Sequence, residues 1–256
     1  MMLEGKVILV AGAAGLLGKA IVTSICEQGG RVIAADLNSE AMSSWLQESD
    51  LGSDRVKPLA LSISDSKSIN AAFELAEEGW GGVDGAVNTS YPRSQSYGKK
   101  FFDVSYDDFC ENLSLHLGGY FLFMQQCAHY AKRNGKVFSL VNLSSIYGVI
   151  APKFSVYEGT GMTMPVEYAA IKSGLLHLNR YVTAEMKGTE FRVNSVSPGG
   201  IHAGQPESFI ERYNAQCSFK GMLDPTDITG TVSFLLSDDS RYILGQNFVI
   251  DDSFSV

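Results

Sequence analysis

The chain has 256 residues, a net charge of −8 at pH 7 and a pI near 5.0. Hydrophobic residues make up 45% and charged residues 19% of the sequence, which is ordinary globular composition and excludes the disordered and collagenous classes. The acidic balance, without a cluster of Lys and Arg, argues against a nucleic-acid partner. This length suits one large α/β domain, and we predict a single domain over residues 1–256.

The amino-terminal segment and the cysteines indicate in which compartment the protein is expected. Residues 1–6 lead into an apolar run that is too short to span a bilayer, and no small-residue cleavage site follows. We therefore expect a cytoplasmic protein without a membrane partner. The four cysteines lie far apart, without Cys-x-x-Cys or Cys/His ligand spacing, so neither a metal site nor a disulfide framework is predicted.

The first elements in the chain predict a dinucleotide-binding βαβ unit. A continuous apolar run at 6–11 is typical of a strand buried on both faces, and a helical pattern follows at 19–28. Between them, Gly12 lets the chain turn off the strand, Gly15 lets backbone N–H groups approach a pyrophosphate, and Gly18 lets the helix pack close to the sheet. For the glycine loop alone, a tight turn without a ligand is the alternative.

The second predicted strand, at 31–35, is followed directly by Asp36. A carboxylate at this distance from the glycine turn accepts hydrogen bonds from the adenosine ribose hydroxyls and repels a 2′-phosphate. Leu37 and Asn38 bring no cation, and Ala13 and Ala14 in the turn are uncharged. The sequence therefore favours NAD(H) over NADP(H) as cofactor.

The same alternation of strands and helices continues along the chain. Helical patterns are found at 39–49, 65–78 and 107–133, and strand patterns at 57–63, 85–88 and 136–143. Alternating elements of this kind predict an α/β Rossmann fold, with a doubly wound parallel sheet of about seven strands and helices on both faces. Cofactor and substrate are expected to meet at the carboxyl ends of the strands.

Two irregular segments follow strands of this predicted sheet. After the fourth strand, residues 91–100 form a polar, basic and aromatic loop in which Arg93, Lys99 and Lys100 could clamp a phosphate or carboxylate. A merely solvated loop is the equally open alternative. Ser144 and Ser145 end the fifth strand, and residues 146–165 after them form a plausible substrate-side loop.

Tyr168 and Lys172 stand four residues apart in an apolar-patterned helical run, so they share one face of the predicted helix. A free tyrosine titrates near ~10, and a neighbouring cation is expected to lower its pKa toward neutrality. A lone Tyr-x-x-x-Lys match is weak, because most helical lysines are solvated surface residues. Its context in this chain makes a proton-transferring tyrosine the preferred interpretation.

The last part of the chain supplies a sixth strand at 191–197, a Pro198-Gly199 turn, a helix beginning at Pro225 and a final strand within 243–250. Residues 202–222 show little periodicity before that helix. We interpret them as a candidate substrate-binding lid of the kind that orders over a bound ligand.

Taken in order, these motifs resemble those of the short-chain dehydrogenase/reductase family over nearly the whole chain. The resemblance implies that Tyr168 is the general acid/base, that Lys172 lowers its pKa and binds the nicotinamide ribose, and that Ser145 hydrogen-bonds the reacting oxygen. It implies a polar small-molecule substrate contacted by Arg93, Ser145 and Tyr157. The cofactor-binding residues implied are Gly12, Gly15, Leu17, Gly18, Asp36, Leu37, Ser62, Ile63, Asn88, Thr89, Ser90, Tyr168, Lys172, Pro198, Gly199 and Ile201.

His116 aligns where the compact branch of the family carries an Asn that helps a proton-relay water. A histidine there is either a catalytic relay or a packed core residue, and Asn112 could instead take that part. The glycine spacing and the long gap between Ser145 and Tyr168 resemble the sugar-nucleotide-modifying branch. The 91–93 loop is similar to oxidoreductases of bacterial surface-sugar and flagellin-glycan pathways.

The leading hypothesis is an NAD(H)-dependent oxidoreductase that interconverts a hydroxyl and a carbonyl on a polar sugar, phosphorylated or nucleotide-linked. The alternatives are an epimerase or dehydratase that retains its NAD, and a dinucleotide-binding protein without catalytic activity. The resemblance also implies a homodimer or homotetramer built through the 107–133 and 165–187 helices, with Phe121, Phe123 and Leu175 at the interface.

Overall fold

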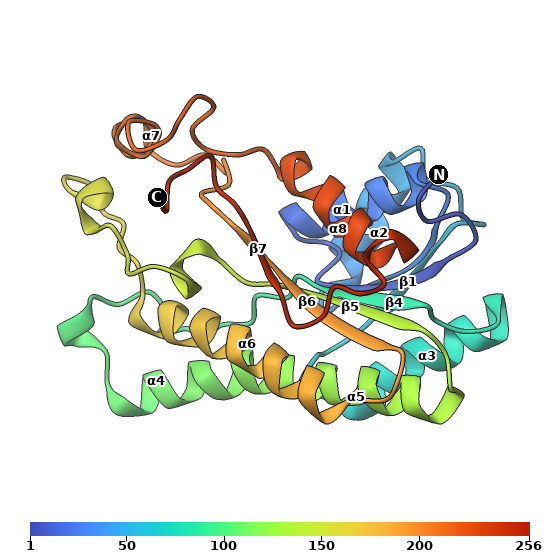
Figure 1. Cartoon of the computed structure of the whole chain (residues 1–256). Coiled ribbons are helices and arrows are strands. Elements are labelled where there is room, and N and C mark those ends of the chain that lie inside the picture. Colours follow the sequence, from blue (N-terminus) through green and yellow to red (C-terminus); the bar gives the residue numbers. More distant parts are fainter.

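The apolar runs form a fully parallel sheet in the computed structural model, which describes residues 1–256 (Figure 1). Its strand order is β3-β2-β1-β4-β5-β6-β7, so the direction of winding reverses between β1 and β4. In such a sheet, ligands bind outside the carboxyl ends of the strands at this reversal point. The strands are β1 (Val7–Ala11), β2 (Arg31–Asp36), β3 (Val56–Ala60), β4 (Gly85–Asn88), β5 (Phe138–Leu143), β6 (Phe191–Pro198) and β7 (Asn247–Ile250).

Helices cover both faces of the sheet, as Figure 1 shows. One face carries α1 (Leu16–Glu27), α2 (Ser39–Glu48) and α8 (Thr229–Leu236), and the other carries α3 (Ser66–Trp80), α4 (Tyr106–Asn112), α5 (Gly119–Asn134) and α6 (Val166–Glu185). The seventh helix, α7 (Glu207–Asn214), projects beyond the sheet and lies near the carboxyl terminus in Figure 1. The expected doubly wound α/β fold is confirmed.

Two hydrophobic cores lie on opposite faces of the sheet because successive side chains of a strand point to opposite sides. Leu9 belongs to a cluster of 25 buried residues that includes Phe73 and Phe123. Its neighbours Ile8 and Val10 belong to a second cluster of 21 buried residues, shared with α1 and α8. All residues of β1, β5 and β6 are buried, as continuous apolar runs predict for strands covered on both faces.

The long helix predicted over 107–133 is interrupted. Helices α4 and α5 are joined by a π-helical turn at Leu113–Gly118, which contains His116. Ser105 caps the start of α4 by accepting the N–H of Asp108, and Gly135, with φ of 59°, ends α5 in the left-handed conformation. The element therefore begins and ends close to where its pattern predicts, but its middle turn is wider.

Three further expectations are corrected. The third strand ends at Ala60 rather than residue 63, because its partner β2 ends at Asp36, opposite Ala60. The candidate lid contains a regular helix, α7. Phe123 and Leu175, expected at a subunit interface, are fully buried in the core of this chain, because they lie on the sheet-facing sides of α5 and α6. None of the helices combines the length and apolar composition that crossing a membrane requires.

Candidate active site

The turn between β1 and α1 leaves no room for a side chain at Gly12 or Gly18. A Cβ on Gly18 would lie 2.1 Å from the carbonyl oxygen of Gly12, and one on Gly12 would lie 2.6 Å from Oγ1 of Thr89. Gly12 also has a φ of 82°, which L-residues rarely adopt. Helix α1 starts without a side-chain cap or an acidic residue in its first turn. Its first N–H groups are therefore suited to an anion such as a pyrophosphate.

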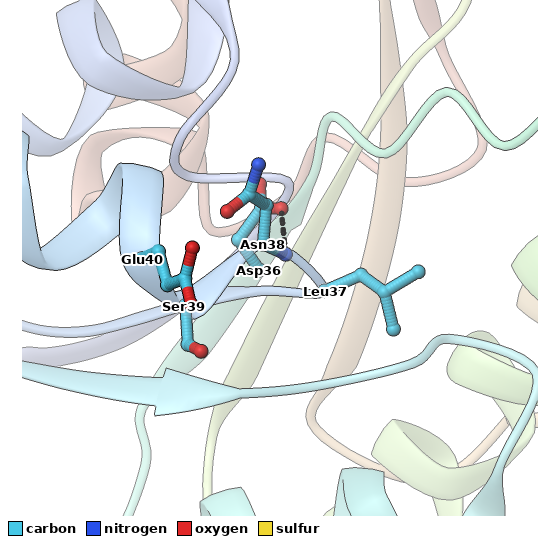
Figure 2. Close-up of a pocket in the computed structure, with 5 residues that line it drawn as sticks. All are labelled: Asp36, Leu37, Asn38, Ser39 and Glu40. Carbon is cyan, nitrogen blue, oxygen red and sulfur yellow. Dashed lines mark hydrogen bonds between the residues drawn. The ribbon is translucent and has the colours of Figure 1, made fainter.

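Asp36 ties the end of β2 to the glycine turn. Its Oδ2 accepts the N–H of Ala14 at 3.0 Å, and its Oδ1 accepts the N–H of Asn38 at 2.9 Å, the bond drawn in Figure 2. Residues 36–40 line a surface hollow of about 570 Å³, and Leu37 points away from Asp36 there (Figure 2). Two of the five lining residues, Asp36 and Glu40, are acidic and none is basic, so a phosphate is disfavoured in this hollow.

A larger cavity, of about 950 Å³, runs from the glycine turn along the carboxyl ends of the strands to the candidate lid. Of the predicted site residues it is lined by Gly15, Leu17, Gly18, Thr89, Ser90, Arg93, Ser145, Tyr157, Tyr168, Lys172, Pro198, Gly199 and Ile201. Arg93 and Lys172 are the only charged side chains in its lining. In a protein of net charge −8, this cavity is therefore locally electropositive.

Ser145, Tyr168 and Lys172 converge in this cavity from two elements. Ser145 follows β5 and its Oγ accepts the N–H of Tyr147 at 3.2 Å, which fixes the hydroxyl at the end of the strand. Tyr168 and Lys172 lie on α6, and Nζ of Lys172 lies 5.6 Å from the centre of the Tyr168 ring. Burial raises the pKa of Tyr168, while the hydrogen bond with Ser145 acts in the opposite direction.

Lys172 also makes contacts that its spacing from Tyr168 does not predict. Its Nζ donates to the carbonyl oxygen of Leu143 at 2.8 Å and lies 5.2 Å from the centre of the Tyr120 ring. Burial lowers the pKa of Lys172 to about 7, so the ammonium is only partly populated at neutral pH. The spacing led us to expect a lowered Tyr168 pKa, but burial of the phenol is the largest influence on it and raises it.

His116 reaches the same group from the π-helical turn. Its Nε2 lies 3.5 Å from Nζ of Lys172, and its Nδ1 is buried without a hydrogen-bond partner. Burial, with the nearby Lys172, lowers the pKa of His116 to about 2, so the ring is neutral. Asn112 has a different role: its side chain accepts the N–H of Ser94 and donates to Ser94 Oγ and Asp108 O. These bonds hold residues 91–104, the predicted loop with the residues that lead into α4 (called the 91–104 loop below), on that helix.

Asn88, Ser62 and Ile63 do not line either cavity. Asn88 is fully buried, and its Oδ1 accepts the N–H of Ser90 while its Nδ2 has no partner. Oγ of Ser62 is hydrogen-bonded to Ser64, and Ile63 packs against Gly119 in the core. Asn88 is therefore buried behind the cavity wall, and Ser62 and Ile63 lie outside both linings.

The sequence did not single out the tyrosines of the 91–104 loop. The Tyr91 ring lies edge-on to Tyr168 at 5.7 Å and to His116 at 5.2 Å, and its hydroxyl lies 2.5 Å from that of Tyr97. The guanidinium of Arg93 lies 5.1 Å from the centre of the Tyr91 ring. The position of Tyr91 just after a sheet strand is the signal that could have identified it.

Two of the three cations of this loop, Arg93 and Lys99, differ in their surroundings. Lys99 is paired with Asp108 at 2.6 Å, outside the cavity lining, whereas Arg93 lines the cavity and forms no ion pair. At the lid side, the cavity lining adds Tyr147, Phe209, Tyr213 and Met222, which belong to a separate cluster of eight buried hydrophobic residues. The lid side of the cavity is thus rich in aromatic side chains, and Arg93 lines the cavity as a cation without an ion pair.

The chain is similar to known proteins along its whole length. The family model described as enoyl-(acyl carrier protein) reductase matches residues 12–255. Post-translational flagellin modification protein A of Campylobacter coli is 41% identical over 259 residues, covering 100% of both chains. The 3-oxoacyl-[acyl-carrier-protein] reductase of Thermotoga maritima is 30% identical and covers 98% of both.

The fold is also similar to that of solved structures. The solved structure of a short chain dehydrogenase from Leptospira borgpetersenii with bound NAD+ superposes with a TM-score of 0.86 at 29% identity, covering 100% of this chain and 94% of that one. The resemblance stated from the motifs is therefore confirmed. This chain belongs to the short-chain dehydrogenase/reductase family of oxidoreductases.

Proposed function

We propose that this protein uses NAD(H) to interconvert a hydroxyl and a carbonyl group on an anionic sugar, either phosphorylated or nucleotide-linked. One observation carries the proposal: a single cavity joins the glycine turn to Ser145, Tyr168 and Lys172, and its only charged side chains are cationic. The relative that is 41% identical is a post-translational flagellin modification protein, which fits the resemblance to flagellin-glycan oxidoreductases on which the sugar substrate is proposed.

The residues present fit a nicotinamide dinucleotide. The pyrophosphate would lie against the glycine turn, where a Cβ would fill the space, and at the uncapped start of α1. The adenosine ribose would be hydrogen-bonded by Asp36. Thr89, Ser90 and the turn at 198–201 line the cavity where the nicotinamide end would lie. When bound, the dinucleotide supplies or accepts the hydride. The hollow at 36–40 has two carboxylates and no cation in its lining, so it would repel the 2′-phosphate of NADP(H) and favours NAD(H).

Proton transfer is assigned to Tyr168. Because burial raises its pKa, the phenol is protonated at neutral pH and can donate its proton to the carbonyl oxygen of the substrate during reduction. Ser145 lies beside it and would hydrogen-bond the same oxygen. Lys172, with its pKa lowered to about 7, can bind and release a proton near neutrality and would also bind the nicotinamide ribose. His116 acts on Lys172 as a neutral hydrogen-bond acceptor.

Arg93 is assigned to the anionic group of the substrate. The cavity lining contains two cations, and Arg93 is the one not assigned to proton transfer. Its guanidinium lies over the Tyr91 ring and has no acidic partner. A guanidinium binds phosphate or carboxylate through paired N–H donors. Tyr157 and the other aromatic side chains of the lining offer ring faces and hydroxyls to the sugar, and residues 202–222 would close over it.

The family resemblance also supports a homodimer or homotetramer. Phe121 on α5 and Tyr181 on α6 are large side chains that are 46% and 62% exposed, on the helices proposed for the interface. Light scattering coupled to size-exclusion chromatography measures the subunit number. A monomer at micromolar concentration would contradict this part of the proposal.

The proposed function is tested by binding and turnover together. Thermal shifts with NADH and NADPH identify the cofactor, and sugar phosphates and nucleotide sugars are then screened with the preferred one. Net change of the reduced-nicotinamide absorbance identifies an oxidoreductase. A sugar product formed without such a change would instead identify an epimerase or dehydratase that retains NAD, and binding without any product a non-catalytic protein.

The role of Arg93 is tested by substitution. Arg93→Met is expected to raise KM for the anionic substrate at least about tenfold while leaving its neutral, dephosphorylated analogue unaffected. Arg31→Met is the matched control, because Arg31 begins β2 at the opposite end of the sheet. Equal effects on the charged and neutral substrates would contradict the assignment.

A further inference from the structure

Tyr213, on α7 of the candidate lid, lies directly on the turn that follows β6. Its hydroxyl oxygen accepts the N–H of Gly200 at 2.5 Å. A Cβ on Gly199 would lie 2.8 Å from that oxygen, and one on Gly200 would lie 2.9 Å from the ring. The two glycines therefore make room for the tyrosine against the backbone, so the position of this turn depends on the position of α7.

The Tyr213 ring also contacts the carboxyl-terminal segment. The ring of Phe254 stacks on that of Tyr213, with centroids 4.1 Å apart and planes 8° from parallel. Phe254 is fully buried although it stands two residues from the end of the chain. Lys153, in the 146–165 segment, donates to the carbonyl oxygen of Phe254 at 2.5 Å and lies 4.6 Å from the centre of its ring. The stack is thus held from the substrate-side loop as well.

The same segment also fixes the end of the lid. Oδ2 of Asp252 accepts the N–H groups of Phe219, Lys220 and Gly221 at 3.1, 2.6 and 2.7 Å. Asp252 has a φ of 50°, a left-handed conformation that Asp tolerates better than most residues. Lid, substrate-side loop and the turn after β6 are therefore joined through residues 251–256.

We propose that Tyr213 is a positioning residue for the nicotinamide end of the cofactor site, and that Phe254 holds it in place. The inference rests on the proposed function, because it takes the 198–201 turn as the contact for that end. Phe209 on the same helix lines the substrate side of the cavity. A substrate that moves α7 consequently moves Tyr213 and the turn beneath it, which couples substrate binding to cofactor placement.

The test compares two ligands that differ in the nicotinamide ring. Titration calorimetry measures Kd for NADH and for ADP-ribose, which keeps the pyrophosphate and both riboses but has no nicotinamide. Tyr213→Phe is expected to raise Kd for NADH about threefold to tenfold, the effect of one lost hydrogen bond, and to leave Kd for ADP-ribose within about twofold. Tyr242→Phe is the matched control, because Tyr242 is exposed and loses the same atom without consequence.

Phe254→Leu provides a second, independent variant, since it removes the stacked ring and keeps an apolar side chain. It is expected to raise Kd for NADH more than Kd for ADP-ribose, as Tyr213→Phe does. Equal weakening of both ligands would show a merely structural role, and unchanged NADH binding would show no role. Either result overturns the inference. If the unsubstituted protein binds neither ligand, the proposed function itself fails, which is a distinct result.

Discussion

Nζ of Lys172 lies 3.5 Å from Nε2 of His116, and both side chains are buried. Burial lowers the pKa of the lysine to about 7 and that of the histidine to about 2. At neutral pH the histidine is therefore a neutral acceptor beside an amine that is close to its own titration point. This pair links the π-helical turn to the proton chemistry proposed for Tyr168.

Replacing His116 is expected to shift the pH dependence of the reaction. In His116→Leu the ammonium form of Lys172 loses an acceptor, so its pKa falls further and the pH–rate profile moves to lower pH by up to about one unit. His116→Asn, which retains an acceptor, is expected to move it less. The measurement is kcat against pH for the three proteins. A profile unchanged in His116→Leu would contradict the proposed contact.

Removing the phenol hydroxyl is expected to abolish most of the activity without affecting cofactor binding. Tyr168→Phe keeps the ring that packs against Tyr91 and loses the proton donor, so kcat should fall about 10²- to 10⁴-fold. Kd for NADH, measured by fluorescence titration, should stay within about twofold. Retention of a tenth or more of the kcat would exclude Tyr168 as the general acid/base.

The buried amine should leave a signature in the stability of the protein. An unfolded lysine titrates at 10.5, whereas Lys172 in the fold titrates at about 7. Between these values the unfolded chain holds a proton that the folded chain lacks, so the free energy of unfolding rises with pH; below pH 7 both forms are protonated and this contribution is constant. Its slope is about 1.4 kcal/mol per pH unit.

Lys172→Met removes this contribution. From urea unfolding at pH 7.5, 8.5 and 9.5, the variant's free energy of unfolding relative to the unsubstituted protein should decrease by about 1.4 kcal/mol for each pH unit. Parallel pH dependences of the two proteins would show that Lys172 keeps an ordinary pKa in the fold.

Substituting Asp36 is expected to change cofactor selection. Asp36→Ala removes the acceptor for the ribose hydroxyls and the charge that repels a 2′-phosphate, so the NADH preference over NADPH should fall at least about tenfold. The melting temperature should also decrease, because the N–H groups of Ala14 and Asn38 lose their partner. Asp36→Asn separates the effects by keeping an acceptor without the charge. A cofactor preference unchanged in both variants would locate the selectivity elsewhere.

Much of this fold was predictable because its signals are local. The buried strands are continuous apolar runs, and Gly12, Gly18 and Asp36 are required by backbone crowding and hydrogen bonds within one βαβ unit. Ser145 and Tyr168 were predictable as well, because a serine at a strand end and a tyrosine on the next long helix point to the same edge of the sheet.

The remaining features depend on contacts distant in sequence. Tyr213 contacts Phe254 and Gly200 only in the folded chain, and no local sequence pattern predicts these contacts. The side of a helix that faces the sheet also depends on its packing angle, so Phe123 and Leu175 were placed wrongly at a surface. Lys172 lies beside Tyr168 as expected, but the lowering of its pKa follows from its burial, which the sequence does not show.

The π-helical turn at Leu113–Gly118 absorbs one residue more than regular α-helix would need between α4 and α5. Because the extra residue is spread over one full turn, the two flanking helices keep the relative orientation of one continuous helix. Deleting one residue within the turn would restore α-helical geometry there and leave α4 and α5 facing their present neighbours. The change would be confined to the turn that carries His116. Anyone aligning or recombining this helix must therefore allow a one-residue gap at the turn while keeping α4 and α5 in register.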